Sequence, residues 1–248
     1  KRMKMFITGG SRGIGHNIMT TALKKGYDVA FSYVNPQTDV DFLLKKAQEI
    51  APDYMCKAYQ LDVSQSEQVT EVVDRVIDDF DGVDVVINNA GINKNNLLFN
   101  MSDGEWHNVL NTNLTGAFYV TRQFLPVFLA QKKGRFITIS SIAKDGISGQ
   151  ASYSASKAGL VGLSGAIAKE YGQKGITSNV VVPGFYDTNM TQQTMSDKLK
   201  KSWVQHCALK RMGRLEELSA AVLFIASDVA SFILGQVISV TGGLDWAA

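Results

Sequence analysis

Short apolar segments alternate with longer amphipathic segments along most of the chain, and this alternation limits the possible folds more than any other feature. Each apolar segment has the length of a strand. Several are apolar throughout, as in a parallel sheet that is covered on both faces. We therefore predict seven buried strands, at Met3–Thr8, Asp28–Tyr33, Met55–Leu61, Val83–Ile87, Arg135–Ser140, Thr177–Val182 and Val237–Val240.

The segments between these strands have the apolar spacing of amphipathic helices. Strands that alternate with helices are typical of an α/β fold, here a Rossmann-type doubly wound sheet of about seven parallel strands with helices on both faces. A length of 248 residues, of which 45% are hydrophobic, is enough for a large core, and no linker or repeat interrupts the pattern, so we expect residues 1–248 to form a single domain. The predicted helices cover residues 14–24, 38–50, 65–79, 103–131, 152–171 and 215–226.

Residues 190–214 break the alternation, because their periodicity is weak and their charge is strongly basic. Six basic residues stand against one acidic residue, a local charge of +5, whereas the whole chain carries +2 and the remainder therefore −3. An insertion of this kind before the last helix is expected to form a substrate lid, and a solvated basic helix pair without a role is the alternative. The charged residues are Lys198, Lys200, Lys201, Lys210, Arg211 and Arg214, with Asp197 as the acid.

Overall charge and cysteine usage exclude several classes of protein. A net charge of +2 is too small for a general nucleic-acid-binding surface. Cys56 and Cys207 lie far apart, which predicts neither a disulfide framework nor a metal site. No apolar segment approaches the roughly 18 residues of a membrane span, and Lys1–Lys4 leads into a strand and not into a signal peptide. We expect a cytoplasmic protein without metal, nucleic-acid or membrane partners.

A glycine-rich turn follows the first predicted strand and precedes the first predicted helix. Its sequence is Thr8-Gly9-Gly10-Ser11-Arg12-Gly13-Ile14-Gly15. Glycines in this position allow a pyrophosphate to approach the backbone, and the free N–H groups and dipole of the helix favour its negative charge. The turn predicts a dinucleotide site, and a purely structural turn is the alternative.

The end of the second strand indicates which dinucleotide is bound. An NAD-binding protein usually has an acidic residue there for the ribose 2′-hydroxyl, but this chain continues from Tyr33 into Asn35-Pro36, and its nearest acid is Asp39. Arg12 can instead meet a 2′-phosphate. We therefore expect NADP(H) in preference to NAD(H), with a role for Arg12 as a plain surface charge left open.

Tyr153 and Lys157 lie at i and i+4 of a predicted helix and therefore on one face. A neighbouring ammonium group lowers the pKa of a phenol, which would let Tyr153 act as a general acid near pH 7. Ser141 directly follows a predicted strand, at the carboxyl edge where open α/β sheets bind ligands. This combination predicts a catalytic site.

These motifs, taken in order, resemble those of the short-chain dehydrogenase/reductase family over essentially the whole chain. The resemblance implies that Tyr153 is the acid/base, that Ser141 binds the substrate carbonyl, that Lys157 holds the ribose and that Asn113 supports a water relay. The matching motifs are Thr8-Gly9-x-x-x-Gly13-x-Gly15, Asn88-Asn89-Ala90-Gly91, Asn113, Ser141, Tyr153-x-x-x-Lys157 and Pro183-Gly184. The implied cofactor contacts are Gly9, Ser11, Arg12, Gly13, Ile14, Gly15, Tyr33, Asp62, Val63, Asn89, Ala90, Gly91, Tyr153, Lys157, Pro183, Gly184 and Thr188.

The loop after Asn89-Ala90-Gly91-Ile92 and the C-terminal part of the chain also resemble those of 3-oxoacyl-(acyl carrier protein) reductases and their acetoacetyl-CoA reductase relatives. The matching residues are Asn96-Leu97-Leu98, Leu209-Lys210-Arg211-Met212-Gly213-Arg214 and Val240-Thr241-Gly242-Gly243. The resemblance implies NADPH-dependent reduction of a 3-oxoacyl thioester in fatty-acid or related acyl-chain biosynthesis. It also places basic docking residues for an acidic carrier protein at Lys132, Lys133 and Lys174. Coenzyme A as the carrier, another ketone or alcohol substrate, and a catalytically silent nucleotide-binding regulator are the alternatives.

Small residues recur along the predicted catalytic helix, among them Gly159, Gly162 and Gly165. Glycine in a helix costs roughly 1 kcal/mol against alanine, so these positions suggest the close approach of another element. Packing within the chain is one explanation. Family resemblance adds a four-helix subunit interface and a homotetramer.

Overall fold

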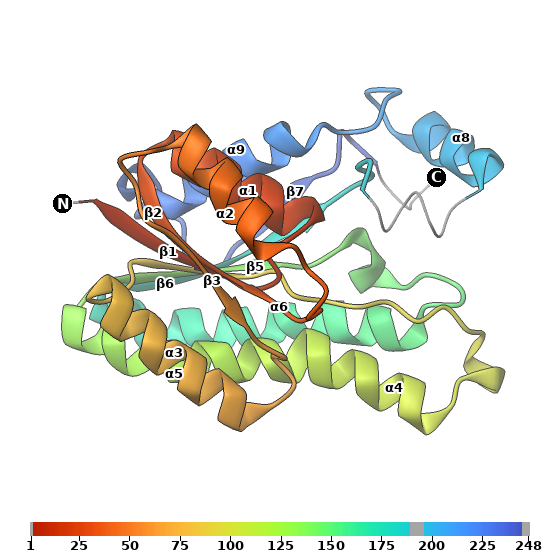
Figure 1. The fold of residues 1–248 in the computed structure, drawn as a ribbon. Helices are drawn as coiled ribbons and strands as arrows, with labels where there is room; N and C mark the ends of the chain where they lie inside the picture. The colour runs from red at the N-terminus through yellow and green to blue at the C-terminus, as the bar shows by residue number, and fades with distance from the viewer. Residues whose placement is uncertain (1, 189–195, 245–248) are drawn as a thin grey trace.

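The computed structural model describes residues 2–188 and 196–244, and its centre is a seven-stranded parallel sheet (Figure 1). The strand order is β3-β2-β1-β4-β5-β6-β7, and every neighbouring pair is parallel. All seven predicted strands are confirmed, with small shifts at their ends. The strands are β1 (Met3–Ile7), β2 (Tyr27–Tyr33), β3 (Cys56–Gln60), β4 (Val85–Asn88), β5 (Gly134–Ile139), β6 (Ile176–Pro183) and β7 (Val237–Val240).

Helices cover both faces of the sheet, as the Rossmann-type prediction requires. Helices α1, α2 and α9 lie on one face, and α3, α4, α5 and α6 lie on the other (Figure 1). The long helices are α1 (Gly13–Lys24), α2 (Val40–Ile50), α3 (Ser66–Phe80), α4 (Asp103–Leu110), α5 (Gly116–Gln131), α6 (Ala151–Tyr171), α8 (Asp197–His206) and α9 (Leu215–Ala226).

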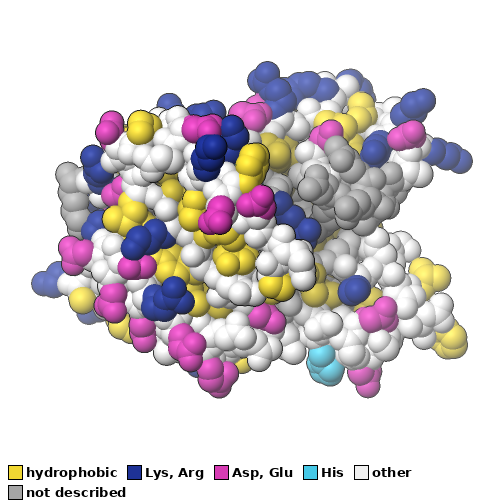
Figure 2. Space-filling view, in the orientation of Figure 1, with side chains coloured by type: hydrophobic (Ala, Val, Ile, Leu, Met, Phe, Trp, Pro, Cys, Tyr) yellow, Lys and Arg dark blue, Asp and Glu magenta, His cyan; other side chains and the backbone are white. Residues whose placement is uncertain are grey.

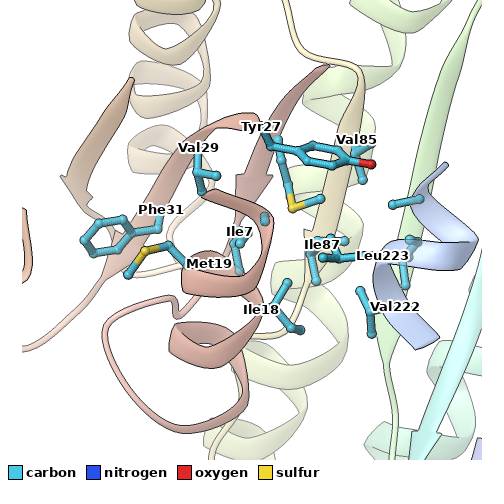
Figure 3. Packing of buried hydrophobic residues seen from close by; sticks show 14 of the residues in the cluster. Ile7, Ile18, Met19, Tyr27, Val29, Phe31, Val85, Ile87, Val222 and Leu223 are labelled. Atoms are coloured by element: carbon cyan, nitrogen blue, oxygen red, sulfur yellow. The ribbon is translucent and has the colours of Figure 1, made fainter. Parts of the chain in front are cut away.

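Side chains of the central strands alternate between two buried clusters. In β1, Met5 and Ile7 face the cluster under α1 and α9, whereas Phe6 faces the cluster under α3 and α5. Figure 3 shows the first cluster, in which Ile18 and Met19 of α1 meet strand side chains such as Ile7. Because both faces are buried, the strands are apolar without polar alternation, which is the pattern seen in the sequence.

Two helical segments differ from the prediction. The expected helix 103–131 is interrupted by a π-helical turn at Asn111–Thr115, which separates α4 from α5. Residues 196–214 contain α8 (Asp197–His206), where the sequence suggested only weak periodicity, while residues 190–195 of the predicted lid lie outside the described part of the chain.

Candidate active site

The residues predicted to bind cofactor and substrate gather at the carboxyl edge of the sheet. Most of them end or directly follow a parallel strand, and those strand ends all lie at the same edge, whereas Asn113, Tyr153 and Lys157 come from the π-helical turn and from α6. The strand order reverses between β1 and β4, so the loops after these two strands diverge and leave a crevice, the usual ligand site of such sheets.

The glycine turn between β1 and α1 has the backbone form of a pyrophosphate cradle. Gly9 and Gly13 both have positive φ values, +67° and +57°. A Cβ on Gly15 would stand 2.3 Å from the Gly9 carbonyl oxygen, so no side chain fits there, whereas a Cβ on Gly13 would meet nothing within 4 Å. The turn is therefore closed on its inner side and open beside Gly13, which fits a dinucleotide phosphate.

Hydrogen bonds attach this turn to its two neighbouring strands. The Asn89 Nδ2 group donates to the carbonyl oxygens of Thr8 and Gly9, both at 3.0 Å, and Thr8 Oγ1 accepts from the backbone N–H groups of Asn89 and Ala90. On the other side, Gly9 N donates to Ser32 Oγ at 3.1 Å. Asn89 thus holds the cradle in shape with its side chain. Thr8 and Ser32 were not predicted as site residues, although Thr8 belongs to the glycine motif itself.

Arg12 lies at the N-cap of α1, with an exposed side chain. Within residues 2–188 and 196–244 its guanidinium makes neither a hydrogen bond nor an ion pair, and Tyr33 stands half-buried at the end of the adjacent β2. A cation in the turn after β1, combined with the lack of an acid at the end of β2, suits a 2′-phosphate.

The remaining predicted cofactor residues occupy the same edge. Asp62 follows β3, and its Oδ1 accepts from the N–H and hydroxyl groups of Ser64 at 2.9 and 2.7 Å. Gly184 follows Pro183, the last residue of β6, and a Cβ on it would stand 2.6 Å from the Thr241 Cα. Thr188 lies a few residues further along and is partly exposed.

Lys157 is buried beneath this edge and holds a backbone carbonyl. Its Nζ donates to the oxygen of Ile139, the last residue of β5, at 2.8 Å, and its own carbonyl accepts from Ser140 Oγ at 2.8 Å. Burial lowers the pKa of Lys157 to about 8. An ammonium group has three N–H donors, so two remain for other acceptors.

Tyr153 stands one turn before Lys157 on α6, next to Ser141. Burial raises the pKa of Tyr153, and a hydrogen bond with Ser141 opposes that shift. The lowering expected from Lys157 is not found in this geometry, because Nζ is bound to Ile139 and lies 5.6 Å from the centre of the Tyr153 ring. Ser141 Oγ also accepts from Ala143 N at 3.1 Å, which fixes the Ser141 side chain at the start of its loop.

Asn113 lies in the π-helical turn and is buried with all its side-chain groups engaged. Its Nδ2 donates to the Ile92 carbonyl and to Ser156 Oγ, both at 3.0 Å, and its Oδ1 accepts from Ile92 N at 2.8 Å. Ser156 in turn donates to the Tyr153 carbonyl at 2.7 Å. Asn113 is thereby connected to the helix of Tyr153. Ser156 was not predicted, although it lies inside the Tyr-x-x-x-Lys motif.

Gly91 separates Asn113 from Lys157. A Cβ at position 91 would stand 3.3 Å from Asn113 Oδ1 and 3.6 Å from Lys157 Nζ. Only glycine keeps this space free, and a polar space between an amide oxygen and an ammonium group suits a bridging water. The structure therefore brings Asn113, Ser141, Tyr153 and Lys157 together.

The predicted docking lysines lie at the other edge of the sheet. Lys132 and Lys133 precede β5 and Lys174 precedes β6, so all three stand at the amino ends of these strands. The six residues of β5, at about 3.3 Å each, separate them from Ser141 by roughly 20 Å. Lys133 is paired with Asp228 at 2.8 Å. Within one chain these lysines therefore lie at the edge opposite Ser141, and their role as docking residues stays a prediction.

Among residues 2–188 and 196–244, no group of His, Cys, Asp and Glu side chains is arranged to hold a metal ion. In the same ranges, no helix combines the length and hydropathy needed to cross a membrane.

Known proteins resemble this chain over nearly its whole length. A family model described as enoyl-(acyl carrier protein) reductase matches residues 9–245. The 3-oxoacyl-[acyl-carrier-protein] reductase FabG of Staphylococcus epidermidis is 39% identical over 239 residues, which are 96% of this chain and 97% of the relative. The proteins of the same name from Staphylococcus aureus and Chlamydia trachomatis are 37% and 38% identical, each over 96% of this chain and over 96% and 95% of their own lengths.

A solved structure shares the fold. The crystal structure of levodione reductase superimposes with a TM-score of 0.93 and 30% sequence identity, and the match covers 99% of this chain and 98% of that one. Similarity therefore extends through every element that builds the site.

Proposed function

Because the chain belongs to the short-chain dehydrogenase/reductase family, we propose that it reduces a 3-oxoacyl thioester, carried by an acyl carrier protein, to the 3-hydroxyacyl thioester with NADPH. The observation that carries this proposal is the convergence of Ser141, Tyr153 and Lys157 at one point of the carboxyl edge, beside the glycine cradle. The full-length similarity to FabG proteins supports the choice of a 3-oxoacyl substrate.

The chain's own groups supply the acid and the orientation for a ketone reduction. NADPH, when bound, supplies a hydride to the C3 carbon. Ser141 and Tyr153 donate hydrogen bonds to the ketone oxygen, and the Tyr153 hydroxyl then gives its proton to that oxygen. Lys157 keeps two N–H donors, which would hold the ribose of the bound cofactor, while Asn113 holds the loop after β4 against α6.

The glycine cradle and the surroundings of Arg12 support a phosphorylated dinucleotide. Gly9, Gly13 and Gly15 accommodate the pyrophosphate, and the Arg12 guanidinium, which has no partner among the described residues, can bind the 2′-phosphate. Residues after β3, β4 and β6, including Asp62, would complete the contacts.

A side-by-side assay tests the reaction. NADPH and NADH oxidation would be followed with acetoacetyl-CoA, with a 3-oxoacyl carrier protein and with the corresponding 2-enoyl thioester, since the matching family model is described as an enoyl reductase. We expect NADPH consumption with the 3-oxoacyl thioesters. If NADPH is oxidised only with the enoyl thioester, the protein is an enoyl reductase and not a carbonyl reductase. If NADPH is oxidised with none of these thioesters, the protein is an oxidoreductase that acts on another substrate.

Two unpartnered surfaces support assembly into a homotetramer. A Cβ on Gly162 or Gly165 of α6 would meet nothing within 4 Å, so these glycines pack against no element of the described chain, whereas Gly159 faces Leu114. The second surface is apolar and surrounds the end of α9, where Val229 and Phe232 are almost fully exposed. Two such faces allow two sets of two-fold contacts, as a tetramer requires. Sedimentation equilibrium measures the state, and a monomer at micromolar concentration would refute it.

A further inference from the structure

The helix α8 turns an apolar side toward the sheet. Trp203 lies 5.8 Å from Phe185, measured between ring centres, and Trp203 and Val204 pack against a buried cluster that contains Ile142. The other side of the helix carries exposed lysines such as Lys198, and Figure 2 shows Lys and Arg side chains on the surface of the molecule over this region. The apolar side of α8 is therefore its inner side.

This inner side adjoins the proposed reacting groups. Ile142 directly follows Ser141, and Phe185 directly follows Gly184 at the cofactor side of the cleft. Ile142 and Phe185 are buried, with 8% and 6% of their surface exposed, whereas Trp203 is only partly buried. Trp203 thus keeps open surface next to the residues that flank the chemistry, and an aromatic ring in such a place suits contact with an apolar part of a substrate.

Hydrogen bonds hold the end of α8 in place. Cys207 directly follows the helix and is buried, and its Sγ donates to the Gly242 carbonyl at 3.1 Å. The backbone N–H of Leu209 donates to the same carbonyl at 3.0 Å. Because Gly242 lies in the turn after β7, these bonds tie the helix to the central sheet. They give Trp203 a defined position, which the wall of a specific pocket requires.

The loops on the other side of this edge present a polar surface. The loop after β4 and the residues before α6 are joined by bonds from Asn96 N to the Gly149 carbonyl at 2.9 Å and from Gln150 Nε2 to Asn95 Oδ1 at 3.1 Å. Amide groups of this kind suit the amide-containing arm of a carrier thioester, whereas an alkyl chain gains most by leaving water against the apolar side of α8. The two sides therefore favour different ends of the substrate.

We propose that Trp203 closes the acyl end of the substrate site and restricts the enzyme to short 3-oxoacyl chains. This inference rests on the proposed function and names the chain length of its substrate. The indole ring occupies space that several methylene groups of a longer chain would need. A short chain ends before the ring, but a long chain must displace Trp203 from its packing against Phe185, which a close-packed cluster resists.

The test measures kcat/KM for the 3-oxobutyryl, 3-oxohexanoyl and 3-oxooctanoyl thioesters of N-acetylcysteamine. We expect the unmodified protein to favour the butyryl over the octanoyl thioester by roughly tenfold or more. Trp203→Ala should raise kcat/KM for the octanoyl thioester roughly tenfold and change that for the butyryl thioester by about twofold at most. Trp203→Leu, which keeps an apolar side chain in the cluster, should give an intermediate ratio and serves if the Ala variant does not fold. Trp106→Ala, at a partly buried tryptophan of α4, is the matched control and should leave the ratio unchanged.

Three results would overturn the role of Trp203. These are an unmodified protein that reduces the octanoyl thioester as well as the butyryl thioester, a Trp203→Ala variant that changes all chain lengths equally, and a Trp106→Ala variant that shifts the ratio as much.

Reduction of none of the three thioesters would refute the proposed reaction and not the pocket. Binding of butyryl-CoA and octanoyl-CoA, measured by calorimetry without turnover, separates the two. Trp203→Ala should then strengthen binding of the octanoyl thioester only, and unchanged binding of both would refute the pocket as well.

Discussion

Lys157 and Lys198 have the same side chain, yet α6 and α8 place them in opposite environments. Lys157 is buried, and its ammonium group donates to the Ile139 carbonyl at 2.8 Å. Lys198 is exposed and has no partner in the described part of the chain. A buried cation has one fixed position and a perturbed pKa, which suits a role in catalysis. An exposed cation acts over a longer distance and suits the attraction of a charged partner before binding. The four predictions below test this division, from the largest effect to the smallest.

Replacing Tyr153 by Phe removes the proposed general acid, which lies on α6 one turn before the buried Lys157. We expect kcat to fall by about 10³-fold, within the usual contribution of general acid catalysis, while NADPH binding measured by fluorescence stays unchanged. Tyr171→Phe, at the far end of the same helix, is the matched control. If Tyr153→Phe keeps a tenth of the activity, the proton comes from another group.

Lys157 makes stability depend on pH in a defined direction. Its pKa falls from 10.5 to about 8 on folding, so the cost of burying the charged form is fully present below pH 8 and disappears as the pH rises toward 10.5. Relative to Lys157→Met, the natural protein should gain about 3 kcal/mol of unfolding free energy between pH 7 and pH 10.5. Urea unfolding at several pH values measures it, with the exposed Lys169→Met as control. A flat difference would mean that Lys157 is not buried as a cation.

Asn113→Ala tests whether the buried hydrogen bonds position the catalytic helix. The substitution removes three hydrogen bonds to Ile92 and Ser156. We expect the activation free energy to rise by about 2 kcal/mol, which lowers kcat roughly thirtyfold. Because Asn113 is proposed to act through positioning, KM for the thioester should change less than kcat. Asn111→Ala, at an exposed position of the same π-helical turn, should change neither. Equal effects of the two substitutions on kcat would contradict a specific positioning role of Asn113.

Arg12 is an exposed cation without a partner in the described part of the chain, and its proposed role is cofactor selection. Arg12→Gln should lower kcat/KM for NADPH about tenfold and leave NADH unaffected, since only NADPH carries the 2′-phosphate. Lys24→Gln, at the exposed end of the same helix, is the control. Parallel losses with both cofactors would show that Arg12 supports the turn and does not read the phosphate.

The fold could be predicted from the sequence, and candidate residues for the site could be named, because both depend on local patterns. Strands apolar on both faces, a glycine turn between a strand and a helix, and Tyr153 four residues before Lys157 are visible as short motifs. The sheet edge at which Lys132 and Lys174 lie also follows from the sequence, because a residue just before a parallel strand stands at the amino end of that strand.

Other features depend on contacts between distant segments and could not be predicted. The bond from Lys157 to the Ile139 carbonyl joins residues 18 positions apart, and it leaves Tyr153 with a pKa raised by burial. The apolar spacing of residues 103–131 is that of one continuous helix, and it gives no sign of the π-helical turn around Asn113. In α8, polar residues dominate, and its apolar side is recognisable only once Trp203 meets Phe185.

The open small-residue face of α6 has a consequence for how such an enzyme must be handled. One rigid helix carries Tyr153 and Lys157 near its start and Gly162 and Gly165 further along. In the proposed tetramer, a second copy would pack against α6, the same helix that positions the reacting groups. Specific activity should then fall when the enzyme is diluted below its dissociation constant, and recover on concentration.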